Sequence, residues 1–360
     1  MSDVVNKWSS AVVAFIGAAG LPNRYGGFEA FLEQCAPEVL KHASAVYVTC
    51  DAGLYEDKSP VYKGVNRVFL RTPANGAYSV LHDLLAFLSV YRQATHIVVL
   101  GVSGGLWFPL FRFLCDLSGK KLAVNVDGVE WQRGKFSLFK RILLRAFDAS
   151  AQIFSHKIIY DNPALERFLF SYCRGKAACI AYSGDHVLRV PNVAKEPGTA
   201  LTICRIEPEN NIEMLIQGAL ASDLKEYVIV GNWGKSAFGR QLRDKYASFK
   251  KLVFLDPVYD PVKLAELRER CEYYLHGHSV GGTNPSLVEM VFYDCRLLCF
   301  DVPYHRETCG EIAGYFRNSA ELTKRLGELK SHDNADRAVR RLKMTKDFIS
   351  RAYLEVVCGK

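Results

Sequence analysis

Several features that would assign a chain to a common class are missing from these 360 residues. No apolar run reaches the roughly 18 residues that a membrane-spanning helix needs. None of the eleven cysteines forms a Cys-x-x-Cys motif, and the closest pairs are Cys295/Cys299 and Cys173/Cys179. Asp-x-Asp, a carboxylate pair that can hold a divalent cation on a diphosphate, is absent as well. The amino-terminal residues resemble a first strand more than a signal peptide. We therefore predict a cytoplasmic protein with reduced, mostly buried thiols and no metal site.

The composition is that of a globular protein, with 49% hydrophobic and 23% charged residues, and the length suits two domains. The net charge of +8 would suit a phosphorylated ligand, an anionic membrane or a nucleic acid, but no nucleic-acid-binding motif is present. Basic and large apolar residues alternate between Lys135 and Lys157, which predicts an amphipathic helix over Ser137–Ser155. Such a helix either lies on a membrane surface or covers a core with a solvated basic face.

Short β-branched runs alternate with segments of helical periodicity along the whole chain, which predicts βαβ units and parallel sheets. Strands are expected at Ala11–Ile16, Ala45–Thr49, Val65–Leu70, His96–Leu100, Leu122–Val126, Lys157–Tyr160, Ala200–Cys204, Glu226–Val230, Lys251–Phe254, Glu272–Leu275 and Arg296–Phe300. Helices in the first half are expected near Gly27–Lys41, Tyr78–Arg92, Leu106–Ser118, Ser137–Ser155 and Pro163–Tyr172. The polar stretch Ser183–Gly198 separates two such sets and suggests a hinge between two doubly wound domains.

Residues that follow the strands of such sheets are where ligands bind, and the segment HGHSVGGTNPSLVEM (His276–Met290) is the most informative of them. A glycine-containing loop leads to Asn284 as N-cap and Pro285 as first helical residue. Backbone NH groups around Gly282, Thr283 and Asn284 would then attract an anion. Glu289, about one turn further, could accept hydrogen bonds from a ribose. The alternative is an ordinary strand-to-helix loop with a good cap.

This segment resembles the donor-site motif of retaining glycosyltransferases of family 4, and the chain is most similar to their rhamnosyltransferase-like branch. The stretches that carry the resemblance are IGAAGLPNRYGGFEAFLE, VDGVEWQRGKF, IIYDNPALERFL, CRIEPENNIEMLIQG, VIVGNWGKSAFG and HGHSVGGTNPSLVEM. The resemblance implies the GT-B architecture, an α/β fold of two Rossmann-like doubly wound domains that face a cleft. It implies an acceptor-side domain at 1–183, a donor-binding domain at 184–345, and a carboxyl-terminal helix at 346–360 that packs back on the first domain.

Two positions depart from the broader family pattern. Gly281 stands where many members have a glutamate, eight residues before Glu289. Arg205 fits the first of two cations that hold the donor diphosphate, but the second position is Asn211. Lys235, in the loop GNWGKSAFG, is our candidate for the missing cation. Structural roles for Arg205 and Lys235 are the alternative.

In the first half, the loop after the first strand ends at Gly26 and Gly27, where a helix start favours an anion. The loop lacks a proper G-x-G-x-x-G, which argues against an NAD oxidoreductase. The resemblance implies that it faces the donor phosphates and the acceptor. Candidate acceptor contacts are Tyr25, Trp131 and Arg133. Asp127, Glu130 or Asp161 could orient the acceptor hydroxyl or take its proton, and the sequence does not separate these three.

Together these features predict a metal-independent enzyme without a cofactor that transfers a sugar from a nucleoside diphosphate, and the resemblance implies that transfer proceeds with retention. The resemblance suggests dTDP-L-rhamnose as donor. It also suggests a lipid-diphosphate-linked saccharide as acceptor, at the inner face of a bacterial membrane. That setting favours contact of the basic helix with anionic lipid. A nucleotide-sugar 2-epimerase and a non-catalytic nucleotide-sugar-binding protein are the alternatives.

Overall fold

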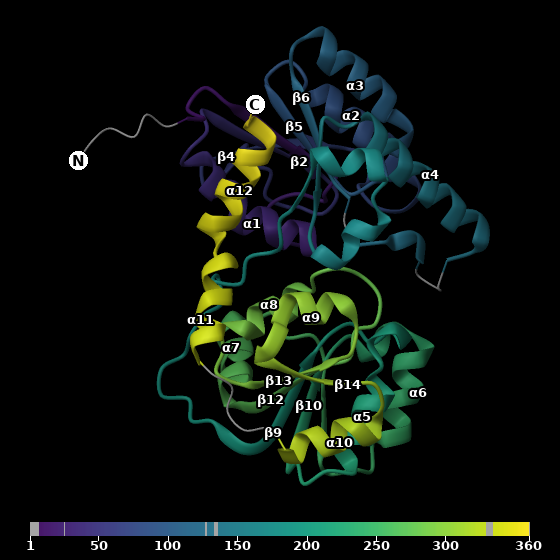
Figure 1. The fold of residues 1–360 in the computed structure, drawn as a ribbon, viewed down its shortest axis with the longest axis vertical. Coiled ribbons are helices and arrows are strands. Elements are labelled where there is room, and N and C mark those ends of the chain that lie inside the picture. Colours follow the sequence, from purple (N-terminus) through teal and green to yellow (C-terminus); the bar gives the residue numbers. More distant parts are fainter. Residues whose placement is uncertain (1–6, 25, 127, 133–135, 329–333, 360) are drawn as a thin grey trace. The chain divides into compact units, whose positions relative to one another are not determined.

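The computed structural model describes residues 7–24, 26–126, 128–132, 136–328 and 334–359, and its contacts divide the chain into two compact units (Figure 1). Unit 1 comprises Met1–Ser183 and Lys346–Lys360, and unit 2 comprises Gly184–Thr345. Each unit contains one sheet with helices on both faces, as the alternation of strands and helices in the sequence predicts.

Within the described part of unit 1, eight strands form a sheet in the order β3-β4-β2-β1-β5-β6-β7-β8, and only β3 is antiparallel to its neighbour. The strands are β1 (Val12–Ile16), β2 (Ala45–Asp51), β3 (Val61–Tyr62), β4 (Val65–Leu70), β5 (His96–Leu100), β6 (Lys121–Asn125), β7 (Lys157–Tyr160) and β8 (Ala177–Cys179). The main helices are α1 (Gly27–Leu40), α2 (Ser79–Val90), α3 (Phe108–Leu117) and α4 (Leu138–Phe154). Strands β2, β4 and β3 lie on one side of β1, and the chain then returns to place β5 on the other side. The strand order therefore reverses between β1 and β5.

In unit 2 the described strands have the order β11-β10-β9-β12-β13-β14, all parallel. They are β9 (Glu196–Ile203), β10 (Glu226–Val230), β11 (Leu252–Leu255), β12 (Cys271–His276), β13 (Arg296–Phe300) and β14 (Ala313–Phe316). The helices are α5 (Ile212–Leu220), α6 (Ala237–Tyr246), α7 (Pro261–Arg270), α8 (Pro285–Val291), α9 (Pro303–Cys309), α10 (Ser319–Glu328) and α11 (Asn334–Lys343). Here the order reverses between β9 and β12.

Both faces of each sheet are buried, which explains why the strands are continuous apolar runs. In β1, Val13 and Phe15 pack in the core on one face, whereas Ala14 and Ile16 pack in the core on the other. Two doubly wound parallel domains were expected from the sequence, and the fold prediction is confirmed.

All eleven predicted strands are present, with bounds that differ by a few residues. The short strands β3, β8 and β14 were not predicted. The helix expected over Pro163–Tyr172 is wrong, because two 3₁₀ turns, Pro163–Phe168 and Ser171–Lys176, take its place. Leu169 and Phe170 between them are extended, with ψ of 141° and 140°. This break lets Leu165, Leu169 and Cys173 all reach the core beneath the sheet.

The carboxyl-terminal helix α12 (Lys346–Cys358) belongs to unit 1, where it lies beside α1 (Figure 1). Its buried residues Ile349, Tyr353 and Leu354 join the core that also contains Phe31. The rings of Tyr353 and Phe31 are 4.7 Å apart. The Tyr353 hydroxyl accepts a 2.7 Å hydrogen bond from Nδ2 of the buried Asn125, at the end of β6. The last helix is thus part of the first unit's core.

Replacing Tyr353 is expected to destabilise unit 1. Tyr353→Phe removes the bond to a buried amide and is expected to cost about 1–3 kcal/mol of unfolding free energy. Tyr353→Ala also removes the ring and is expected to cost about 3–5 kcal/mol. Phe348→Ala, on the same helix but with 49% of its side chain exposed, is the control. Chemical denaturation measures all three, and equal losses for Tyr353→Ala and Phe348→Ala would contradict the packing of α12.

Candidate functional site

The best-defined group of polar residues in unit 2 lies where the strand order reverses, at the carboxyl ends of β9 and β12. In doubly wound sheets this is where ligands bind. The loop after β9 and the loop after β12 are joined by hydrogen bonds in both directions. Nδ2 of Asn211 donates to the carbonyl of Gly277 at 2.8 Å, and the backbone NH of Ser279 donates to the carbonyl of Glu209 at 2.9 Å. These hydrogen bonds therefore hold the two loops together.

Close approach of these loops requires glycine at position 277. A Cβ on Gly277 would lie 2.3 Å from the carbonyl oxygen of Asn210. Asn211 has φ 50° and ψ 33°, in the left-handed region that asparagine tolerates better than most residues. Asn211, the residue at the position expected to lack the second cation, thus shapes the turn and holds Gly277.

A hydrogen-bonded chain runs through the two loops from Arg205 to His278. Nδ2 of Asn210 donates to the carbonyl of Arg205 at 2.7 Å, and Oδ1 of Asn210 lies 2.8 Å from Nδ1 of His278. Because the amide nitrogen is directed at a carbonyl, its oxygen faces the imidazole, and Nδ1 of His278 is the donor. In the neutral ring Nε2 then carries the lone pair.

Gly281 lies against this imidazole. Its φ is +142°, where side chains are strained, and an added Cβ would lie 3.0 Å from Nε2 of His278. A side chain at this position would be strained in this backbone and would press against the imidazole of His278. The connection of His278 to Arg205 was missed by the sequence analysis. This connection depends on the contact of Asn210 with His278, two residues that are distant in the sequence and meet only in the folded chain.

Two further imidazoles, His276 and His305, are buried beneath the same loop with ring centroids 4.7 Å apart. Burial lowers the pKa of His305 to about 4. Burial, with smaller contributions from His305 and His278, lowers the pKa of His276 well below its ordinary value. Both rings are neutral at pH 7 and add no positive charge to this end of the sheet.

Glu289 lies on α8 with its carboxylate between two side chains of unit 2. It forms an ion pair with Arg268, and Nε2 of His186 lies 3.1 Å from Oε1. Burial alone would raise the pKa of Glu289, but the hydrogen bond from His186 and the charge of Arg268 outweigh it and lower the pKa. The carboxylate is ionised at neutral pH and retains lone pairs for other donors, since a carboxylate offers about four acceptor positions.

The predicted cations both follow strands at the same edge of the sheet. Arg205 follows β9, and Lys235 ends a short 3₁₀ turn after β10, the neighbour of β9. Both side chains are exposed, and Arg205 lies 4.0 Å from Glu207. The buried Trp233 anchors the turn with an indole hydrogen bond of 3.2 Å to the carbonyl of Ile229.

The backbone of the loop before α8 has the predicted cap. Oδ1 of Asn284 accepts from the backbone NH of Ser286 at 3.0 Å, and Pro285 is the first helical residue. Thr283 is buried, and Gly282 is partly exposed. The structure thus brings Arg205, Lys235, Gly282, Thr283 and Asn284 to one edge of one sheet.

In unit 1, the loop after β1 is held by α1. The backbone NH of Ala19 donates to Oε1 of the buried Glu29 at 2.6 Å, and the NH of Asn23 donates to Oε2 of Glu33 at 3.1 Å. Gly27 begins α1, as predicted, and Gly26 is its N-cap. Glu29 was missed by sequence reasoning, and it places a carboxylate in the helix turn that was expected to attract an anion.

A second residue missed by sequence reasoning is Asp83, on α2. It is fully buried and accepts a 2.7 Å hydrogen bond from Ser103 in the loop after β5. Burial raises its pKa to about 7, against the opposing effect of hydrogen bonds from Ser103 and the backbone of Gly104. Asp83 therefore fixes the loop that lies beside the loop after β1.

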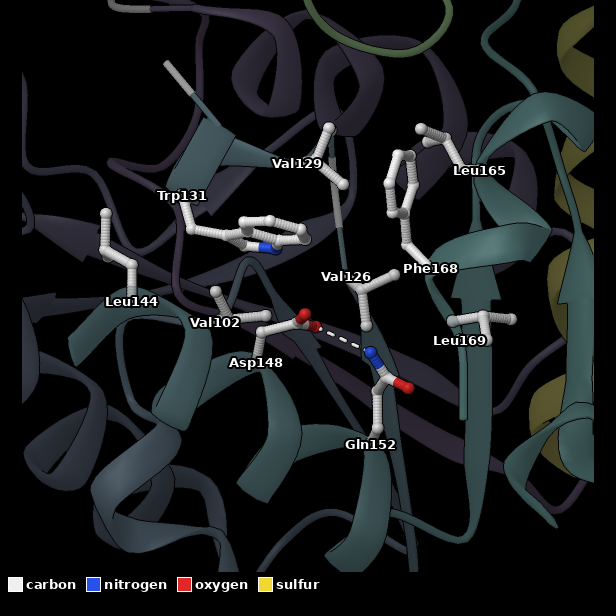
Figure 2. Close-up of a pocket in the computed structure, with 11 residues that line it drawn as sticks. Val102, Val126, Val129, Trp131, Leu144, Asp148, Gln152, Leu165, Phe168 and Leu169 are labelled. Atoms are coloured by element: carbon white, nitrogen blue, oxygen red, sulfur yellow. Dashed lines mark hydrogen bonds between the residues drawn. The ribbon is translucent and has the colours of Figure 1, made fainter. Parts of the chain in front are cut away.

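The other predicted residues of unit 1 are distributed as follows. Asp161 follows β7 and is buried, and Trp131 is partly exposed and lines a small hollow in unit 1 (Figure 2). Tyr25, Asp127 and Arg133 lie outside the described residues, as does the side chain of Glu130. Their predicted roles at the acceptor stay predictions.

Helix α4 coincides with the predicted amphipathic helix, and Lys135, before it, lies outside the described residues. Its apolar side chains are not all directed to the core: Leu138, Phe139 and Ile142 are 71%, 78% and 61% exposed. Lys140 is exposed among them. Across the part of the chain that the structure describes, no helix is both long and apolar enough to cross a bilayer.

Comparison with known proteins identifies the fold. Residues 10–185 match a sequence family described as a domain of unknown function (DUF1972). No curated protein matches the chain. Among solved structures, sucrose-phosphate synthase from Thermosynechococcus elongatus superposes with a TM-score of 0.71 at 13% identity, covering 97% of this chain and 96% of that one.

Two other solved structures agree with this result. Anabaena HepE in complex with UDP and glucose gives a TM-score of 0.70 at 13% identity, covering 97% of this chain and 100% of that one. The lipopolysaccharide outer core galactosyltransferase WaaB gives 0.64 at 13% identity, covering 97% and 99%. The chain therefore has the GT-B glycosyltransferase fold.

Asp83 is expected to make the stability of unit 1 depend on pH. Its folded pKa of about 7 exceeds the ordinary value of 3.8. The folded state is thus fully stabilised below about pH 4 and loses on the order of a few kcal/mol as the pH rises to 7. Asp83→Asn is expected to abolish this loss in thermal unfolding between pH 5 and pH 8.

Asp57→Asn is the control, because hydrogen bonds from Ser59 and Arg67 lower the pKa of Asp57 to about 2 and its titration ends below this range. An equal pH dependence in the wild type and Asp83→Asn would show that Asp83 is not the titrating group.

Proposed function

We propose that this protein is a retaining glycosyltransferase that moves a sugar from a nucleoside diphosphate to a hydroxyl of a lipid-linked saccharide. The observation that carries the proposal is the pair of joined loops where the strand order of unit 2 reverses, with Arg205 and Lys235 exposed at the same edge. The shared fold supports it, because HepE was solved with UDP and glucose. The resemblance of the sequence to family-4 enzymes makes L-rhamnose from dTDP-L-rhamnose the best candidate donor.

In this proposal Arg205 and Lys235 neutralise the donor diphosphate. His276 and His305 cannot do so, because burial keeps both imidazoles neutral. Backbone NH groups of Gly282, Thr283 and Asn284 contribute further donors. Stabilisation of the leaving diphosphate by fixed donors and cations is the form of catalysis that this arrangement supports.

Glu289 holds the ribose in this proposal, through lone pairs that Arg268 and His186 leave available. Glu289→Ala would be a poor test. Because the Arg268 side chain is only 8% exposed, losing its partner would leave a buried charge unpaired and destabilise the fold.

The acceptor hydroxyl is deprotonated or oriented by one of Asp127, Glu130 and Asp161 in this proposal, and Tyr25, Trp131 and Arg133 contact the acceptor. We propose that Gly26 and Gly27 approach the donor phosphates. We also propose that transfer needs no metal ion or cofactor, since the sequence lacks Asp-x-Asp. Transfer takes place in the cytoplasm at the inner face of the membrane. The alternatives, a nucleotide-sugar 2-epimerase and a non-catalytic binding protein, predict no transfer to an acceptor.

Removing a diphosphate-binding cation is expected to weaken nucleotide binding. Calorimetry with dTDP and UDP should show affinity reduced about tenfold or more in Arg205→Gln and in Lys235→Gln, since a hydrogen bond to a charged group contributes about 1.5–3 kcal/mol. The control is Lys250→Gln, because Lys250 is also exposed but precedes β11, at the amino ends of the strands. Equal affinities in all four proteins would contradict the assignment.

The same proteins test the reaction when they are incubated with a panel of nucleotide sugars, with and without EDTA. Release of nucleoside diphosphate from one donor, unchanged by EDTA, is the expected result. Loss of release in EDTA would refute the metal-independent mechanism.

Membrane contact through α4 is expected to require its exposed apolar residues. Leu138→Ser/Phe139→Ser should lower binding to vesicles that contain anionic lipid by about tenfold or more, because two large side chains lose their burial. The matched control is Val339→Ser/Leu342→Ser on α11, a basic helix of unit 2 whose residues Val339 and Leu342 are also exposed. Sedimentation with vesicles measures both, and a loss confined to the α11 variant would move the contact to unit 2.

A further inference from the structure

Helices α2 and α3 cover the same face of the unit 1 sheet and lie side by side (Figure 1). At their starts, Nε1 of Trp107 donates to the carbonyl of Val80 at 2.9 Å. At their ends, the Tyr91 hydroxyl donates to the carbonyl of Leu114 at 2.8 Å. The two helices therefore run in the same direction and are in contact at both ends.

The side of this helix pair that points away from the sheet carries large apolar side chains. On α2 they are Leu81, Leu85 and Leu88. On α3 and the turn before it they are Leu106, Leu110, Phe113 and Leu117. Their exposed fractions lie between 36% and 70%, and we term these seven residues the apolar strip. Intervals of four and three residues place each row along one line of its helix, as in the seams of helical bundles.

The two rows form one surface, because the side chains between them are apolar as well. Phe87 of α2 stacks on Phe111 of α3 with ring centroids 4.0 Å apart, so these sides of the helices meet. With 3.6 residues per turn, Leu84 and Leu114 lie between that contact and the exposed rows, and both are partly buried. Apolar surface therefore continues from α2 to α3.

The apolar strip carries no net charge of its own. The ionisable side chains of α2, His82 and Asp83, are buried on the side that faces the sheet. On α3, Nε of Arg112 pairs with Oδ2 of Asp116 at 2.7 Å, and Oδ1 of Asp116 lies 2.8 Å from Nε2 of His156. By the helical repeat, this pair lies on the side of α3 away from α2. The charges thus lie at the edge of the strip and offset each other.

Such a surface suits a protein partner better than an anionic membrane. Helices that lie on anionic lipid carry lysine and arginine beside their apolar face, as α4 does at Lys140. The exposed cations that follow α2 and α3 in the sequence, Arg92 and Lys121, come only after the carboxyl ends of these helices. Along its length the strip therefore offers little attraction to lipid phosphates.

The area of the apolar strip agrees with the apolar part of a protein interface. A fully exposed side chain of this size has roughly 150 Å² of surface, so seven that are about half exposed provide on the order of 500 Å². A standard interface takes about 800 Å² from each partner, of which about 65% is apolar in homodimers. That is also about 500 Å². Exposed apolar patches larger than a few hundred Å² mark interaction sites.

We propose that the apolar strip is the contact surface of a homodimer, in which α2 and α3 pack against α2 and α3 of a second copy. In a two-fold dimer both copies use the same surface, which must be complementary to itself. A face without net charge meets this condition, because packing it on its copy brings no like charges together. The strip includes no residue assigned above to the donor or the acceptor, so the dimer does not depend on the proposed function.

Sedimentation equilibrium of the full chain, from about 1 µM to about 100 µM, tests the proposal. The mass is expected to approach twice the 40.4 kDa of one chain as the concentration rises. A mass of one chain at every concentration would overturn the dimer.

Two matched double variants locate the contact. Leu88→Glu/Phe113→Glu places a carboxylate in each row and is expected to raise the dissociation constant at least hundredfold, because burying an unpaired charge is costly. Leu138→Glu/Phe139→Glu makes the same changes at exposed residues of α4 and is expected to stay dimeric. Circular dichroism establishes that both are folded. An unchanged dimer in the strip variant, or dissociation of the α4 variant alone, would refute the assignment.

Hydrogen–deuterium exchange of the wild type tests the same surface without any substitution. Exchange in residues 79–90 and 105–117 is expected to be slower at about 100 µM than at about 1 µM, since the dimer covers both helices. Equal rates in both segments would contradict the proposal. Protection of these segments by vesicles of anionic lipid, in a protein that sediments as a monomer, would also overturn the dimer and assign the strip to the membrane.

Discussion

The joining of two loops across the point where the strand order of unit 2 reverses is the interaction on which the candidate site depends. Asn210 connects the backbone of Arg205 to the imidazole of His278, and Asn211 holds the carbonyl of Gly277. Because both asparagines use their side chains inside the protein, the loops keep their shape without a ligand. A preformed loop pair loses little entropy when a donor binds.

This constraint also determines where positive charge is placed. The uncharged side chain of Asn211 takes part in the loop contact, and burial keeps His276 and His305 neutral. The exposed cations Arg205 and Lys235 follow neighbouring strands. The position of Lys235 depends on the buried Trp233, which fixes the turn after β10. In the proposed donor site, the positive charge for the diphosphate would therefore come from two strand ends of one sheet.

The sequence predicted the parts of this arrangement that depend on local pattern. Buried strands such as Val12–Ile16 are continuous apolar runs, and Asn284–Pro285 is a recognisable helix start, so both were found. Contacts between distant segments were not predicted, because periodicity carries no information about them. The bond between Asn210 and His278, the ion pair of Glu289 with Arg268, and the burial of Asp83 beside Ser103 all arise only when the strands take their order. The helix expected over Pro163–Tyr172 failed for a related reason, since core packing at Leu169 outweighed local propensity.

The most direct test of the central claim, that the carboxyl edge of β10, β9 and β12 binds a nucleoside-diphosphate sugar, is hydrogen–deuterium exchange with and without dTDP-L-rhamnose and UDP-glucose. The account predicts slower exchange with at least one of them in three segments of unit 2, residues 204–211, 231–236 and 277–284. Unchanged exchange in all three segments at saturating concentrations of donors that do bind, with protection elsewhere in the chain, would contradict it.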